Sequence, residues 1–234
     1  MNFSQLPAEA FKEGQVILID KPLHWSSFQV VNKLRWLLRK KFDLKKIKVG
    51  HAGTLDPLAT GLLIICTGKF TKKIDIYQAQ EKEYTGTFTL GATTPSYDAE
   101  TEIDARFDIS HITNENIMQA TCMFLGEIDQ QPPVFSALKK DGKRMYELAR
   151  AGEEIDIPSR RVTILEFEIT RISLPEVDFR VVCSKGTYIR SLAHDFGKSL
   201  GVGAYLSALR RTKIGTFSVD NAIDINDFAE SFSS

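Results

Sequence analysis

The sequence is poor in cysteine and holds no cysteine or histidine arrangement that would bind a metal. Its three cysteines, Cys66, Cys122 and Cys183, are odd in number and far apart, and they form no CxxC pair. We therefore expect buried, reduced thiols and no disulfide framework. The four histidines are also widely separated, and none has a neighbour at metal-ligand spacing: His24, His51, His111 and His194. The sequence gives no support to metal catalysis.

Long apolar runs and several common motifs are missing as well. The longest clear apolar run, residues 62–66, is far too short to cross a bilayer. Residues 1–15 lack the basic region and apolar stretch of a secretory signal, so we expect a cytoplasmic protein with no membrane partner. Gly68 and Lys69 lack the upstream glycine of a P-loop, and no GxSxG occurs.

The chain has no net charge, since 30 basic residues balance 30 acidic ones. The basic residues nevertheless gather in three groups. These groups are Lys33, Arg35, Arg39, Lys40, Lys41, Lys45, Lys46 and Lys48; Lys139, Lys140, Lys143 and Arg144; and Arg210, Arg211 and Lys213. Any one group is explained by a solvated surface. Three together favour a positive face that binds an anionic partner.

The composition, 43% hydrophobic and 26% charged, is that of a soluble globular protein. Hydrophobic patterns predict strands at residues 16–20, 62–66, 82–90, 162–172, 177–183 and 214–219. They predict helices at 113–124, 144–151, 187–200 and 204–210. A further helix begins at Ser26 or Ser27, with an apolar face of Phe28, Val31, Leu34 and Leu38. Because strands and helices do not alternate strictly, we expect one α+β domain over residues 1–234.

Residues 50–61 combine three glycines, one proline and a single carboxylate, Asp56. Such a segment cannot be the interior of a regular helix or strand, so it predicts a shaped loop. Two interpretations stay open from these residues alone. Asp56 is either a positioned reactive group or an Asx residue that stabilises a tight turn.

The segment GHAGTLDPLATGLL at residues 50–63 resembles the GHxGxLDPxAxGxL signature of the TruB-type tRNA pseudouridine synthases. Four other segments resemble that family in the same order. They are Asp20-Lys21-Pro22 with Ser26-Ser27, Lys82-Glu83-Tyr84, residues 133–139 with Gly142 and Tyr146-Glu147, and SKGTYIRSL at residues 184–192. Asp98-Ala99 also resembles an acidic turn of the family. The resemblance covers about residues 14–217. Five matching segments in the same order do not arise by chance.

The resemblance implies a pseudouridine synthase-like α+β fold, with a mixed, mainly antiparallel sheet flanked by helices and loops. It implies an isomerase that converts uridine to pseudouridine in the T-loop of tRNA, at position 55, with no metal or organic cofactor. The essential aspartate of the family corresponds to Asp56. A carboxylate there can act as nucleophile or electrostatic stabiliser. Three roles of the Asp56 carboxylate remain open: attack on C6 of the base, attack on C1′ of the sugar, and assistance in the deprotonation of C2′.

The resemblance also implies roles around the substrate. Arg190 corresponds to the arginine that pairs with the catalytic aspartate, and we expect Arg190→Ala to keep the fold and lose most activity. Tyr84 would stack on the flipped uracil, although a core tyrosine fits the same strand pattern. His51 would contact RNA. Four residues either shape the base pocket or simply pack in the core, and the sequence favours neither role: Lys21, Pro22, Ile189 and Leu192. Phosphate contacts are expected at Lys40, Lys41, Lys45, Lys46, Lys139 and Lys143.

The sequence departs from the family pattern at two positions near these motifs. Ala52 replaces a common threonine, so a hydrogen bond of the loop is missing or replaced. His24 replaces a common glycine, which predicts that φ is not positive there. We also expect no C-terminal PUA-type RNA-binding domain, and a monomer. Two alternatives remain: a non-catalytic tRNA-binding protein, and a synthase acting on another RNA.

Overall fold

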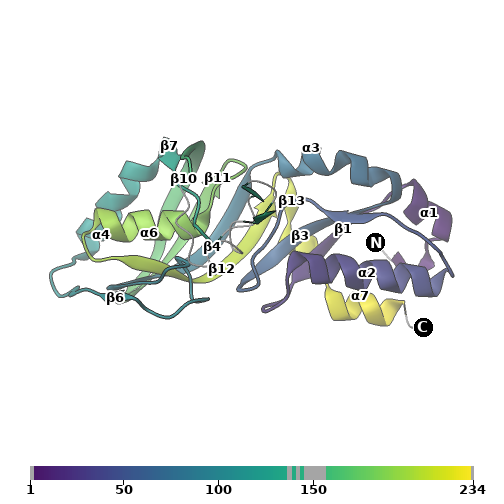
Figure 1. Cartoon of the computed structure of the whole chain (residues 1–234), viewed down its shortest axis with the longest axis horizontal. Helices are drawn as coiled ribbons and strands as arrows, with labels where there is room; N and C mark the ends of the chain where they lie inside the picture. The colour runs from purple at the N-terminus through teal and green to yellow at the C-terminus, as the bar shows by residue number, and fades with distance from the viewer. Residues whose placement is uncertain (1–2, 136–138, 141–142, 145–156, 233–234) are drawn as a thin grey trace. The chain divides into compact units, whose positions relative to one another are not determined.

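The computed structural model describes residues 3–135, 139–140, 143–144 and 157–232. The chain forms two compact units, each described by itself (Figure 1). Unit 1 contains Met1–Tyr84 and Leu209–Ser234, and unit 2 contains Thr85–Ala208. Strands β4 (Lys82–Leu90) and β12 (Ala204–Ile214) contribute residues to both units. The expected strand at residues 82–90 is confirmed with the same bounds.

The strands of unit 1 surround β3 (Ala59–Thr67), which contains the expected strand at residues 62–66. β1 (Val16–Lys21) and β2 (Val49–His51) both pair antiparallel with β3. The Leu209–Arg211 part of β12 pairs in parallel with β3 at Ala59–Gly61. The short strands β14 (Ile223–Asp224) and β13 (Phe217–Ser218) pair with β1 and β12. Because β3 has partners along its length, eight of its nine residues are buried, all except Thr60.

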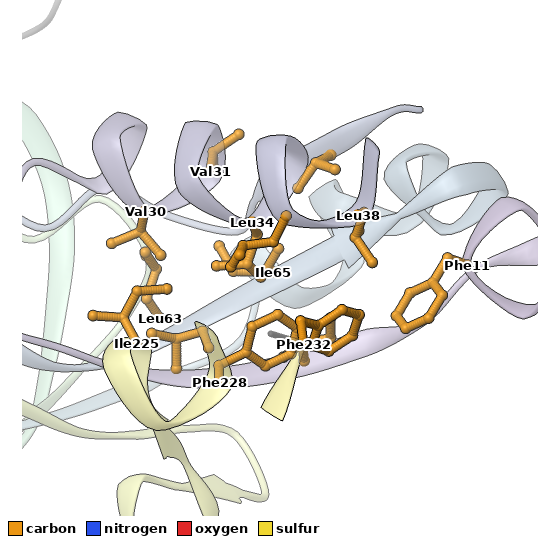
Figure 2. Packing of buried hydrophobic residues seen from close by; sticks show 14 residues of the cluster. Phe11, Val30, Val31, Leu34, Leu38, Leu63, Ile65, Ile225, Phe228 and Phe232 are labelled. Atoms are coloured by element: carbon orange, nitrogen blue, oxygen red, sulfur yellow. The ribbon is translucent and has the colours of Figure 1, made fainter. Parts of the chain in front are cut away.

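Helix α2 (Ser27–Lys41) provides much of the core of unit 1. Ser26 is its N-cap and forms a capping box with Gln29. Figure 2 shows Leu34 and Leu38 of α2 facing the apolar side chains of β3 and of α7 (Ile225–Ser231). The helix is therefore held mainly by burial, worth about 1.5–3 kcal/mol for each leucine. The expected apolar face is correct except at Phe28, whose side chain is 62% exposed.

The remaining helices of unit 1 are short. They are α1 (Ala8–Glu13), α3 (Ile74–Gln78) and the 3₁₀ helices η1 (Phe3–Gln5), η2 (Gly68–Lys73) and η4 (Val219–Asn221). Phe11 of α1 lies against Phe42 and Phe232, with ring centroids 5.6 and 6.0 Å away. The two ends of unit 1 thus share one aromatic core with α2.

The sheet of unit 2 has the strand order β12, β4, β11, β10, β7. The long strand β10 (Arg160–Ser173) pairs antiparallel with β11 (Glu176–Cys183) and with β7 (Gly126–Gln130). Two separate antiparallel pairs join β5 (Ala92–Thr93) to β6 (Ala105–Arg106) and β8 (Lys139–Lys140) to β9 (Lys143–Arg144). The mixed, mainly antiparallel sheet that the sequence predicted is confirmed.

Helices α4 (Asn114–Thr121) and α6 (Ile189–Ser199) contact each other and lie beside the sheet of unit 2 (Figure 1). Thr113 caps α4 as the sequence predicted, and 3₁₀ helix η3 (Cys122–Phe124) follows it. The core rings are Phe88, Phe124, Phe167, Phe179 and Phe196. The stack of Phe88 on Phe179, with centroids 4.1 Å apart, ties β4 to β11.

Some local predictions are wrong. Residues 204–210 form strand β12 and not a helix, because backbone pairing overrides the helix preference of alanine and leucine. The expected strand at residues 214–219 is divided between the end of β12, β13 and η4. Cys66 and Cys183 are buried as expected, but Cys122 is exposed. The expected helix at residues 144–151 falls almost wholly outside the described residues.

Candidate active site

Asp56 lies in unit 1, in the connection between β2 and β3. The backbone N–H of Ala59 donates to the carbonyl of Asp56 at 3.0 Å, so a tight turn delivers the chain into β3. At Gly61, where φ is +101°, a Cβ atom would lie 2.3 Å from the carbonyl oxygen of Arg211. Only glycine therefore allows β3 and β12 to approach this closely behind the loop.

Ser27 fixes the loop from the first turn of α2. Its hydroxyl donates to the carbonyl of Leu55 at 3.0 Å and accepts from the Leu55 N–H at 2.8 Å. The serine is 2% exposed, so water does not compete for these bonds. The residue directly before Asp56 is thus held at both of its polar backbone groups. The sequence identified Ser27 as a candidate helix cap and as part of a family segment, but not as a contact of the Asp56 loop.

Arg211 of β12 holds the same loop from the other direction. Its guanidinium donates to the carbonyls of Leu62, Thr54 and Gly53 at 2.8, 3.3 and 3.1 Å. The residue is 1% exposed, and three carbonyl oxygens share a planar fork of donors that only arginine provides. Arg211 is a positioning residue for the loop of Asp56. Sequence reasoning missed it and assigned it to a basic surface group.

Lys21 ends β1 beside this loop and is completely buried. Its ammonium group donates to the carbonyls of Pro22 and Trp25 at 2.9 and 2.6 Å. The pKa of Lys21 is lowered to about 8, mainly by burial; the negative charges of Asp56 and Asp20 oppose this shift, and the positive charge of Arg211 adds to it. The Asp56 carboxylate thus favours the charged form of the Lys21 ammonium group.

His24 also contacts the loop, through its backbone. Its N–H donates to the carbonyl of Pro57 at 2.8 Å, directly after Asp56. The φ angle of His24 is +65°, so the prediction that this position avoids positive φ is wrong. A histidine tolerates the left-handed region here because its exposed side chain meets no neighbouring turn.

His51 and Ala52 enter the loop from β2. Burial lowers the pKa of His51, and the positive charge of Arg211 lowers it further, so the imidazole is neutral at pH 7. Its Nδ1 atom is buried and finds no hydrogen-bond partner within the described part of the chain. The methyl group of Ala52 is fully buried against Leu62 and Ile64, where an apolar side chain fits.

Two members of the third basic group form ion pairs within unit 1, and the third, Arg211, is buried there. Arg210 donates both terminal nitrogens to the carboxylate of Asp20, at 3.0 and 2.6 Å. Lys213 lies 3.3 Å from the carboxylate of Glu83. Arg211 is buried and the other two are paired with carboxylates, so the group as a whole does not form a free positive surface.

Tyr84 and Arg190 are both buried, at 8% and 5% exposure. Tyr84 is the third residue of β4 and the last residue of the first segment of unit 1. Arg190 belongs to α6 in unit 2, where its Nε lies 3.7 Å from the buried carboxylate of Asp98 and Nη1 donates to the Ser96 carbonyl at 3.4 Å. Arg190 is therefore no solvated surface residue.

The remaining predicted site residues have clear positions. Pro22 follows β1 and is half-buried, whereas Ile189 and Leu192 of α6 are buried in unit 2. Lys40, Lys41, Lys45 and Lys46 are exposed in unit 1. The side chains of Lys139 and Lys143 lie outside the described part of the structure. The structure thus brings Lys21, Arg211 and Ser27 together around Asp56, within unit 1.

Within the described residues, no three His, Cys, Asp or Glu side chains gather as a metal ion would require. No helix in that part of the chain is long and apolar enough to cross a membrane.

A family model described as TruB family pseudouridylate synthase (N terminal domain) matches residues 39–189. The chain belongs to the TruB family of pseudouridine synthases. A second model, the tRNA pseudouridylate synthase B C-terminal domain, matches residues 190–233. The resemblance found in the sequence motifs is confirmed, and with it the assignment to a family of isomerases.

TruB relatives match over nearly the whole chain. A tRNA pseudouridine synthase B of Flavobacterium johnsoniae is 69% identical over 224 residues, which cover 95% of this chain and 98% of the relative. One of Phocaeicola vulgatus is 54% identical and covers 94% of each chain. One of Chloroherpeton thalassium is 52% identical, covering 93% of this chain and 90% of its own.

Solved structures agree with this fold. A chain in the crystal structure of a Cbf5-Nop10-Gar1 complex matches with a TM-score of 0.71 and 32% identity. A chain in an H/ACA RNP bound to a substrate RNA containing 2′-deoxyuridine matches with a TM-score of 0.68 and 29% identity. Each match covers 97% of this chain but spans only 56% of the solved chain.

Proposed function

We propose that this chain is a tRNA pseudouridine(55) synthase, which isomerises one uridine of the T-loop of tRNA. In that reaction the bond from N1 to C1′ breaks, the uracil turns, and C5 bonds to C1′. The observation that carries the proposal is the half-buried Asp56 in a loop fixed by Ser27 and Arg211. A positioned carboxylate of this kind supplies a nucleophile or a stabilising charge for glycosidic cleavage.

The other roles follow from the proposed reaction. The target base must leave its stack to reach Asp56, and Tyr84 is the ring proposed to stack on it. Lys21, whose pKa is about 8, keeps a positive charge near Asp56 at neutral pH. His51, neutral at pH 7, is proposed to contact the RNA. The family resemblance assigns Arg190 as a cation for Asp56, and that assignment stays a prediction.

The setting of the enzyme is part of the proposal. We propose that residues 1–234 act as a single catalytic domain and as a monomer, in the cytoplasm, without a metal or organic cofactor. The exposed lysines Lys40, Lys41, Lys45 and Lys46 bind phosphates of the tRNA, so affinity falls steeply with salt. A binding constant that does not change with salt would contradict this assignment.

Mapping of pseudouridine in unmodified tRNA transcripts tests the proposal. The transcripts are incubated with the wild-type protein, with Asp56→Asn, and with Asp75→Asn, a control at an exposed carboxylate of α3. We expect product at the T-loop uridine with wild type and Asp75→Asn only. Binding without product for all three proteins would indicate a non-catalytic tRNA-binding protein. Product at another position or only in another RNA would indicate a different substrate.

A further inference from the structure

Trp36 stands on the outer face of α2, opposite the core, and is 52% exposed. Two lysines lie against its ring, with the Nζ atoms of Lys33 and Lys40 at 5.5 and 5.0 Å from the ring centroid. The indole borders a concavity of about 470 Å³, which also involves Arg35 and Arg39. This volume lies within the range of about 300–1,000 Å³ that is usual for small-ligand sites.

Arg35 and Arg39 also border a second, larger concavity of about 660 Å³ on unit 1. Its other basic residues come from α1, from the segment before β2 and from η2: Lys12, Lys45, Lys46, Lys48, Lys69 and Lys72. Lys12 and Lys69 form ion pairs with Glu9 and Glu13, at 3.6 and 2.7 Å. Within the described residues the other basic side chains of this concavity form no ion pair. Arg35 and Arg39, which form no ion pair within the described residues, therefore border both concavities.

The two arginines are held in place by the protein. Arg35 donates to the carbonyl of Val49 at 3.0 Å and to the side chain of Asn32 at 2.8 Å. The Nε of Arg39 donates to the carbonyl of Leu44 at 3.3 Å. These bonds hold the guanidinium groups in place, so little side-chain freedom is lost when a phosphate binds the remaining N–H groups. A merely solvated basic run would not hold its arginines to the backbone at a concave surface.

We propose that Trp36 and the arginine pair form a second RNA-binding site, which takes an unpaired nucleotide of the substrate RNA. The base stacks on the indole of Trp36, and its phosphates lie along Arg35, Arg39 and the neighbouring lysines. A positive groove beside an exposed aromatic ring is the combination that binds single-stranded nucleic acid. The choice of RNA as the anion rests on the proposed function.

The relative strengths of the contacts favour a base on the ring. Stacking of one base is worth about 5- to 150-fold in affinity, whereas an exposed lysine over a ring is worth about 2- to 5-fold. A base therefore displaces a lysine from the indole, and the released ammonium group can bind the adjoining phosphate. An acidic peptide offers the charge but no ring to replace the lysines.

The site is separate from Asp56 although both lie in unit 1. Ser27 contacts the residue before Asp56, and Trp36 follows nine residues later on the same helix. At a rise of 1.5 Å per residue, Ser27 and Trp36 are about 14 Å apart along the axis of α2. The second site thus holds a nucleotide other than the target uridine.

Tryptophan fluorescence tests the stacking directly, because the chain contains only two tryptophans. The variant Trp25→Phe leaves Trp36 as the sole emitter, and its thermal unfolding is compared with wild type to establish that it is folded. An oligouridylate hexamer is titrated into this variant. We expect saturable quenching that weakens with salt. Unchanged emission, or equal quenching by inorganic polyphosphate, which has no bases, would overturn the proposal.

Binding of the hexamer to matched variants provides the second readout. Trp36→Ala should weaken binding about 5- to 150-fold, and Trp36→Phe should retain most of the affinity. Phe28→Ala removes another exposed ring of α2, 62% exposed, that does not border the concavity, and should change little. Equal affinity of Trp36→Ala and wild type for the hexamer would contradict a stacking site. Displacement of the hexamer by polyglutamate at comparable concentration would also contradict it, and would indicate an acidic protein partner.

The second site and the proposed function fail in different ways. Asp56→Asn should lose pseudouridine formation and keep the quenching of Trp36. A protein that quenches with RNA but forms no pseudouridine refutes the proposed function alone. A protein that forms pseudouridine, with the same KM for tRNA in Trp36→Ala as in wild type, refutes the second site alone.

Discussion

Arg211 donates to the carbonyl of Thr54, two residues before Asp56, from a side chain that is 1% exposed. The carboxylate is therefore oriented by a buried cation on a different strand, which also binds Gly53 and Leu62. This contact has the most direct consequences for activity, because displacement of a reacting group by about 1 Å can cost about 100-fold in rate.

Replacing Arg211 by lysine should lower kcat about 10- to 100-fold and change KM for tRNA much less. Lysine retains the charge but has no fork of donors for three carbonyls, so the loop loses its fixed geometry. Steady-state kinetics with a tRNA transcript measure the changes in kcat and KM separately. Arg210→Lys is the matched control, since Arg210 binds Asp20 and the Thr60 side chain of β3, and none of the carbonyls that Arg211 holds. Equal kinetics for the two variants would contradict a positioning role.

The stability of the protein should depend on pH through Lys21. The pKa of Lys21 is lowered to about 8 in the folded protein from 10.5, so the folded state holds fewer protons than the unfolded state between pH 8 and 10.5. Stability from this group therefore rises with pH across that window and is constant below it. Urea unfolding of wild type and Lys21→Met over pH 7–10.5 measures the difference. A difference that stays flat over the window would show that the pKa is not lowered.

Arg190→Ala should destabilise the protein by about 3–5 kcal/mol, because it leaves the carboxylate of Asp98 buried without this cation. The sequence predicts that this variant keeps its fold, and the buried pair predicts that the fold is retained with lower stability. Arg180→Ala is the control. Arg180 pairs with the exposed Glu166, so its loss should cost less than about 1 kcal/mol. Urea denaturation compares the two; similar losses would mean that the Arg190 pair contributes no more than a surface pair.

His24→Gly should stabilise the protein by about 0.5–1 kcal/mol, because relief of the left-handed conformation at φ +65° outweighs the extra backbone freedom of glycine when unfolded. His111→Gly, at an exposed histidine without positive φ, should instead destabilise by about 0.5–1 kcal/mol. Thermal or urea unfolding measures both. Destabilisation of His24→Gly would show that the imidazole contributes contacts that exceed the strain.

Much of the fold was predictable from local patterns. The spacing of Val31, Leu34 and Leu38 identified α2, and Thr113 identified the start of α4, because amphipathic period and caps are local signals. Strand β12 was mistaken for a helix because its identity depends on pairing with β3, which no local pattern reveals. The exposure of Phe28 likewise depends on which part of α2 meets the sheet.

The site was predictable only in part. Asp56 could be found because its loop combines glycines, a proline and a family motif. Arg211 could not, since a buried arginine and a surface arginine look alike in a sequence and differ only in the carbonyls that surround them. The positive φ of His24 is set by a backbone bond to Pro57, a contact across the loop that residue type does not reveal.

Single-turnover formation of pseudouridine tests the central claim most directly. The protein is used in excess over a tRNA transcript, so that weak binding does not limit the yield, and wild type is compared with Asp56→Asn and Asp75→Asn. We predict full conversion of the T-loop uridine by wild type and Asp75→Asn, and none by Asp56→Asn. Conversion by Asp56→Asn at the wild-type rate would show that this carboxylate does not carry the reaction.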